Sequence, residues 1–301
     1  MHRLFLILTF TVLLITACSP RTLSTPQSGP IVLTSTTFLA GIAQNVAGDR
    51  VQVTSLVPAG SDPHTFQAAP SDIQKIAEST VVIVNGLDYD QFIMPLLESA
   101  GGTRLIITAS DGLEVRRVKG ETGEAAIDPH MWMVPTRVIK YVENIRDGLT
   151  KADPGGVSIY KTNADAYISQ LKELDTWIKQ QVALIPPERR QLVTNHDSLG
   201  YFAESYGFTV IGTIIPNVSS EVSPSAQQIV ALIDEIKSTN APAIFLNRSD
   251  NRQLADQVVE ETGISVVTDL YIESLSPSDG PAATYIDMMK HNVSRIVVAL
   301  K

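Results

Sequence analysis

The chain has 301 residues, of which 44% are hydrophobic and 18% are charged, and its net charge at pH 7 is -9. This composition is typical of a globular protein with room for two domains, and it excludes disorder over most of the chain. The negative charge argues against nucleic acid and against anionic lipid surfaces as partners.

The N-terminus predicts an export signal. Residues 1–17 contain an apolar run that is shorter than the roughly 20 residues of a membrane-spanning helix. Small residues precede Cys18, the only cysteine of the chain, and this pattern resembles a bacterial lipoprotein box. We therefore expect Cys18 to be the lipidated N-terminus, with residues 18–30, rich in Ser, Thr and Pro, as a flexible tether. An ordinary cleavage site near Ala17 is the alternative.

From residue 31 onward, short β-rich runs alternate with helical stretches. Strands are expected at residues 31–34, 51–57, 81–84, 104–108, 191–194, 209–213, 243–246 and 265–268, with helices at 38–46, after 70, at 91–100, 201–206 and 225–237, and up to about 262. This alternation predicts βαβ units and mainly parallel sheets. We therefore predict an α/β protein with two Rossmann-like lobes, residues 31–156 and 186–301.

A long helix is expected to join the lobes. Apolar and aromatic residues recur at steps of three and four through residues 157–185, and neither Gly nor Pro interrupts them. A continuous helix of this length, about 42 Å, is a rigid connector. A long packed helix within one large domain is the alternative interpretation.

Two of the five histidines, His64 and His130, follow the same Asp-Pro pair. The Asp can form an Asx turn and Pro fixes its φ, which holds the following side chain in place. His64 and His196 follow predicted strands, and Asp269 comes directly after residues 265–268. Because ligands of open α/β sheets bind beyond the carboxyl ends of the strands, these side chains can meet in a cleft between the lobes.

Three neutral imidazoles and one carboxylate make a four-coordinate site of the zinc type. Each residue taken alone has a simpler explanation, because a loop histidine is often a solvated turn residue and an Asp after a strand is a common helix cap. His2 lies in the predicted signal peptide, and we expect His291 to be exposed and uninvolved.

Several segments together resemble the TroA-like family of zinc- and manganese-binding solute-binding lipoproteins of bacterial ABC importers. They are S-D-P-H-T-F-Q-A-A-P-S-D-I, D-P-H-M-W, H-D-S-L-G-Y-F-A-E-S-Y-G and E-T-G-I-S-V-V-T-D-L, in the family's order over nearly all of the chain after the tether. The resemblance implies that His64 and His130 from the first lobe and His196 and Asp269 from the second bind the metal in the cleft between the lobes.

The resemblance also bears on which metal is bound, and the chain departs from the family at one position. A histidine as third ligand favours zinc, whereas a glutamate there is associated with manganese, and nitrogen ligands suit zinc. Residues 112–127 lack the histidine-rich loop of many zinc-dedicated members, so manganese stays the alternative ion. Asn247 and Arg248 stand where the family commonly has a Glu after the strand, which leaves the surrounding hydrogen bonds open.

We expect the protein to capture a divalent ion outside the cytoplasm and to deliver it to an ABC permease and its cytoplasmic ATPase. We expect a monomer, which is either anchored by its lipid to the outer face of the cell membrane or periplasmic. We do not expect an enzyme. A zinc hydrolase needs an open metal position and a nearby base, yet no H-E-x-x-H motif is present and no Glu lies within two residues of His64, His130 or His196. The alternatives are a binder of a metal chelate or small organic ligand on the same scaffold, and a surface adhesin.

Overall fold

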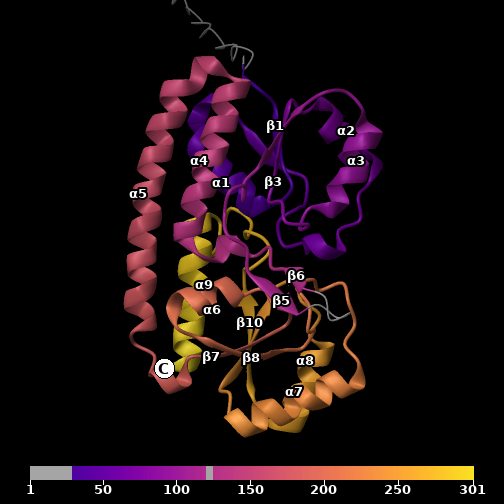
Figure 1. Ribbon diagram of the computed structural model, residues 1–301, viewed down its shortest axis with the longest axis vertical. Helices are drawn as coiled ribbons and strands as arrows, with labels where there is room; N and C mark the ends of the chain where they lie inside the picture. Colours follow the sequence, from indigo (N-terminus) through magenta and orange to yellow (C-terminus); the bar gives the residue numbers. More distant parts are fainter. Residues whose placement is uncertain (1–28, 120–124) are drawn as a thin grey trace, which may run out of the picture.

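The computed structural model describes residues 29–119 and 125–301. They form two α/β lobes, one above the other in Figure 1, with helix α5 (Val157–Val182) running along the side of both. This arrangement confirms the predicted fold class of two lobes with mainly parallel sheets. The predicted signal peptide, Cys18 and most of the tether lie outside the described residues.

The N-terminal lobe is a parallel sheet between two layers of helices. Its strands are β1 (Val32–Thr34), β2 (Val53–Ser55), β3 (Val81–Val84) and β4 (Leu105–Thr108), in the order β2-β1-β3-β4. Its helices are α1 (Thr37–Ala47), α2 (Pro70–Glu78), α3 (Met94–Ala100) and α4 (Pro135–Ala152). Side chains alternate between the faces of the sheet, so Val32 packs with α1 and α4 while Leu33 packs with α2 and α3.

The C-terminal lobe repeats this topology. Its strands are β7 (Gln191–Thr194), β8 (Thr209–Thr213), β9 (Ala243–Asn247) and β10 (Ser265–Leu270), and its helices are α6 (Gly200–Tyr206), α7 (Ala226–Thr239), α8 (Gln253–Thr262) and α9 (Tyr285–Leu300). Read from the β8 edge, the strand order is second, first, third, fourth, as in the N-terminal lobe. The chain reverses its winding beside the first strand of each lobe, and such switch points are where α/β sheets bind ligands.

Three features of the described residues were not predicted from the sequence. Helices α4 and α9 were not predicted, although the buried residues of α4 have helical spacing (Val138, Tyr141, Val142, Ile145 and Leu149). The third is an antiparallel hairpin of β5 (Arg117–Lys119) and β6 (Ala125–Ile127), just before His130.

Helix α5 joins the lobes through packing as well as through the chain. It packs on α1 and α4 of the N-terminal lobe and on α9 of the C-terminal lobe. One continuous hydrophobic cluster includes buried residues of both sheets and of α5, so the lobes share a core. No helix of the described residues is long and apolar enough to cross a membrane.

The shared core makes α5 a determinant of stability. Leu171 is fully buried on α5, so Leu171→Ala should lower the free energy of unfolding by about 2–5 kcal/mol, through lost apolar burial and the cavity left behind. Denaturant unfolding measures this change. The matched control is Lys172→Ala at the neighbouring exposed position, expected within about 0.5 kcal/mol of the wild type. Equal effects of the two substitutions would contradict the packing described here.

Candidate metal centre

Four side chains meet between the lobes: His64, His130, His196 and Glu273. Each offers one nitrogen or oxygen atom, and these four atoms all lie within 4.8 Å of one another. The side chains of His130, His196 and Glu273 are almost completely buried, with exposed fractions of 0%, 1% and 1%. Each lobe contributes two of the four.

The two Asp-Pro-His segments fold alike. Asp62 accepts a hydrogen bond from the backbone N–H of His64, and Asp128 accepts one from that of His130, both at 2.9 Å. These are the Asx turns that the sequence predicted. Asp128 also lies 2.8 Å from Nδ1 of His130. When Nδ1 donates to Asp128, the lone pair of Nε2 faces the site.

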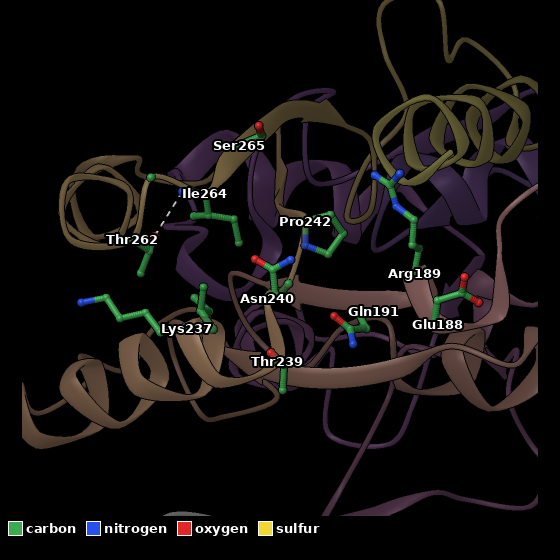
Figure 2. A pocket seen from close by; sticks show the side chains of 13 residues that line it. Glu188, Arg189, Gln191, Lys237, Thr239, Asn240, Pro242, Thr262, Ile264 and Ser265 are labelled. Carbon is green, nitrogen blue, oxygen red and sulfur yellow. Dashed lines mark hydrogen bonds between the residues drawn. The ribbon is translucent and has the colours of Figure 1, made fainter.

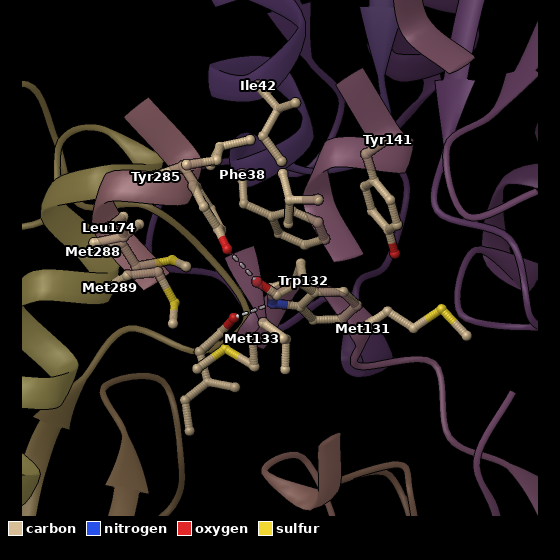
Figure 3. Packing of buried hydrophobic residues seen from close by; sticks show 14 of the residues in the cluster. Phe38, Ile42, Met131, Trp132, Met133, Tyr141, Leu174, Tyr285, Met288 and Met289 are labelled. Carbon is tan, nitrogen blue, oxygen red and sulfur yellow. Dashed lines mark hydrogen bonds between the residues drawn. The ribbon is translucent and has the colours of Figure 1, made fainter. Parts of the chain in front are cut away.

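The backbone before Glu273 is held from both lobes. The indole of Trp132 donates to the carbonyl of Ile272 at 2.8 Å, and the side-chain oxygen of Asn247 accepts from the Ile272 N–H at 2.9 Å. Figure 3 shows Trp132 in the core, close to Phe38 and Tyr285. Asn247 therefore helps to position the residue next to Glu273.

Asp269, the expected fourth ligand, is not in this cluster. Its carboxylate accepts from Arg295 Nε at 2.9 Å, its side chain is 33% exposed, and its carbonyl lies 2.8 Å from His291 Nε2. His291 itself is partly buried rather than exposed. The structure therefore does not bring Asp269 together with the three histidines, and Glu273 is the acidic residue that lies beside them.

Asp269 lies outside the cluster because of where β10 ends. The predicted strand ended at residue 268, but β10 continues through a register shift to Leu270, and the next residues cross to the N-terminal lobe. The chain reaches the cleft only at Glu273. The sequence contained a signal for this position, because Glu273 is the one charged residue in the mainly apolar run L-Y-I-E-S-L.

Burial and neighbouring charges set the protonation of the cluster. Burial lowers the pKa of His64 to about 3, which keeps this ring neutral. Burial alone would also lower the pKa of His130, but the charge of Glu273 and the hydrogen bond to Asp128 raise it to about 10. Although burial opposes it, the histidines hold the pKa of Glu273 well below its usual value. Without a bound cation, the favoured state pairs a protonated His130 with the Glu273 carboxylate.

The donor atoms fit a small divalent ion. Nε2 of His64, of His130 and of His196 and Oε1 of Glu273 are buried without a hydrogen-bond partner, and buried polar atoms are rarely left so. Oε1 lies 3.3 Å from Nε2 of both His130 and His196. Donors about 2.0–2.1 Å from a tetrahedral zinc ion are about 3.3–3.4 Å apart.

Arg116 ties the lobes together beside the cluster. Its guanidinium contacts Asp128 at 3.1 Å in its own lobe, and Asp197 at 3.2 Å and Glu204 at 2.8 Å in the other lobe. Asp128 orients His130, and Asp197 follows His196 in sequence. One guanidinium therefore contacts acidic residues next to two of the clustered rings.

Two cavities flank the cluster. One, of about 710 Å³, is lined by His64, Tyr89 and Pro129 among others, and the second, of about 480 Å³, is lined by Asp62 and Asp250 among others. His64 is the only member of the cluster that lines either of them. A third cavity, in Figure 2, lies at the amino ends of the C-terminal strands, the end opposite His196, and is lined by residues such as Gln191 and Ser265.

Two α/β lobes that hold a small buried site between them are typical of solute-binding proteins. The family model "Zinc-uptake complex component A periplasmic" (ZnuA) matches residues 32–299. The chain belongs to this ZnuA/TroA family of solute-binding proteins of metal ABC transporters.

Relatives within the family are named as binding proteins for different metals. The chain is 35% identical over 269 residues to the manganese-binding lipoprotein MntA of Halalkalibacterium halodurans, covering 89% of this chain and 88% of that protein. It is 32% identical over 266 residues to the iron-binding protein YfeA of Yersinia pestis, covering 88% of this chain and 84% of that one. The periplasmic zinc-binding protein TroA of Treponema pallidum superimposes with a TM-score of 0.83, at 27% identity over 90% of this chain and 99% of TroA.

Replacing Glu273 and Asp269 by their neutral amides tests which of the two contributes to metal binding. Glu273→Gln should weaken metal binding at least about tenfold, because it removes the negative donor, whereas Asp269→Asn should leave it unchanged. Calorimetric titration of the metal-free proteins with Zn²⁺ measures both. Weakening by Asp269→Asn alone would restore the original expectation and refute the site described here.

Proposed function

We propose that this protein captures a divalent transition metal outside the cytoplasm and delivers it to the permease of an ABC importer, which a cytoplasmic ATPase drives. The observation that carries the proposal is the set of four buried donor atoms without partners, two from each lobe, within 4.8 Å of one another. In this proposal the ion is cargo, and the protein acts as a monomer.

We propose zinc as the preferred cargo, with manganese as the alternative. Three imidazole nitrogens and one carboxylate oxygen form a donor set that suits zinc, whereas manganese prefers more oxygen donors. The 3.3 Å separations of Glu273 Oε1 from two ring nitrogens also support an ion of zinc's size in tetrahedral coordination. The relatives are named for manganese, iron and zinc, so the choice rests on this geometry.

We propose that lipidation of Cys18 anchors the protein to the membrane. Pro30 and Ile31 directly precede β1, so the preceding segment would tether the N-terminal lobe. The tether would leave the lobes and their site in the extracytoplasmic space.

The competing functions fit the cluster less well. A hydrolytic zinc site keeps one position open for water, whereas Glu273 here supplies a fourth protein donor. A chelate or organic ligand needs a cavity lined by aromatic and polar groups, whereas the four donors converge on a point too small for more than an ion.

Removing single rings tests the proposal directly. His130→Ala or His196→Ala should each weaken zinc binding by a factor of about 100 or more, because the remaining three donors cannot close a tetrahedral shell. His291→Ala is the matched control and should retain one zinc per chain, since its ring lies outside the cluster. Elemental analysis of the dialysed proteins gives the stoichiometry. Full zinc occupancy in a variant lacking all three cluster rings would refute the proposal.

Metal binding should release a proton. His130 is protonated at neutral pH because its pKa is raised to about 10, and its nitrogen must lose that proton to bind an ion. Affinity should therefore rise with pH, about tenfold per unit between pH 6 and 8. Calorimetry at pH 7 in two buffers of different ionisation enthalpy should show about one proton released per ion. Affinity unchanged down to pH 5 would exclude imidazole ligation.

A further inference from the structure

The two oxygens of the Glu273 carboxylate have different surroundings. Oε1 faces the ring nitrogens and has no hydrogen-bond partner, whereas Oε2 accepts a hydrogen bond from the hydroxyl of Tyr89 at 2.7 Å. A carboxylate can offer one oxygen or both to a metal ion. Here one oxygen is already engaged by a protein donor from the opposite lobe.

Tyr89 is fixed in place by its neighbours. Its side chain is almost fully buried, and its ring lies edge-on to His64 at 5.2 Å and against Trp132 at 4.8 Å. Burial and, to a smaller extent, the charge of Glu273 raise the pKa of the Tyr89 hydroxyl well above its usual value. The hydroxyl therefore keeps its proton and remains a donor at neutral pH.

The backbone before Tyr89 is unusual. Gly86, Leu87 and Asp88 all have positive φ values, of 87°, 57° and 63°. Two consecutive non-glycine residues in this region are costly and persist only where the surroundings hold them. The carboxylate of Asp90 accepts from the Gly86 N–H at 2.6 Å and closes the turn. This strained turn directs Tyr89 toward Glu273.

We propose that Tyr89 is a specificity-determining residue that restricts Glu273 to one donor oxygen and so holds the bound ion at four-coordination. The inference rests on the proposed function and concerns the choice among ions. A four-coordinate site with one oxygen favours zinc, whereas manganese gains from a second carboxylate oxygen and a higher coordination number. Tyr89 does not touch the ion and acts through Glu273.

The test uses the full folded domain with Co²⁺ as a spectroscopic probe of coordination number. Four-coordinate Co²⁺ absorbs visible light strongly, whereas five- and six-coordinate Co²⁺ absorb weakly. The wild type should give the strong spectrum. Tyr89→Phe removes only the hydroxyl, and it should give the weak spectrum because Oε2 becomes free to bind. The ratio of the Mn²⁺ to the Zn²⁺ dissociation constant should fall about tenfold in this variant.

Tyr206→Phe is the matched control. Its hydroxyl also donates to a buried carboxylate, Asp175, at 2.8 Å, but on α5 and α6 away from the cluster. This variant should keep the wild-type Co²⁺ spectrum and the wild-type metal preference. It shows what the loss of one buried tyrosine hydroxyl does to the fold alone, as followed by thermal unfolding.

The outcomes separate this inference from the proposed function. A weak Co²⁺ spectrum of the wild type would overturn the role of Tyr89 without any variant. An unchanged spectrum and metal preference in Tyr89→Phe would also overturn it, while metal capture itself would stand. A wild type that binds none of Co²⁺, Zn²⁺ and Mn²⁺ would overturn the proposed function and, with it, this inference.

Discussion

The buried carboxylate of Glu273 is the constraint on which the rest of the site depends. Removing a carboxylate from water costs several kcal/mol unless a positive charge and hydrogen bonds compensate it. The hydroxyl of Tyr89 supplies a hydrogen bond but no charge. The positive charge must come from a proton on His130 or from a cation among the three rings. In the proposed function, a divalent ion among the rings would displace the proton of His130 and take over the compensation of the carboxylate.

The repeated topology of the lobes explains how the ligands are held. The third strand of each lobe leads to an asparagine, Asn85 after β3 and Asn247 at the end of β9. Asn85 donates to the carbonyl of Pro129, just before His130, and Asn247 accepts from the N–H of Ile272, just before Glu273. An amide can accept and donate at once, and Asn247 also donates to Ser249. A carboxylate at this position could only accept, so it could not make both of these hydrogen bonds.

Sequence reasoning reached the fold class and the three histidines for identifiable reasons. Alternating strands and helices and the paired Asp-Pro-His segments are local signals, and each survives in the structure as a sheet or an Asx turn. The fourth residue of the cluster depends on where a strand ends and on how the chain then crosses between lobes. A difference of two residues at the end of β10 and a crossing held by Trp132 decided between Asp269 and Glu273. Neither is encoded in local periodicity, and the Tyr89 contact across 184 positions is equally non-local.

The contacts that hold the clustered side chains in place are unequal. His130 and Glu273 are anchored through Asp128, Trp132 and Asn247 to a core that both lobes share. His64 lies instead on a single turn at Pro63–Thr65, where Asp62 holds its backbone and the hydroxyl of Ser220 reaches Asp62 from the opposite lobe. Of the two cavities beside the cluster, one is lined by His64 and neither is lined by another member of the cluster. His64 therefore depends on one short turn that contacts from both lobes hold in place, whereas His130 and Glu273 depend on the core that the lobes share.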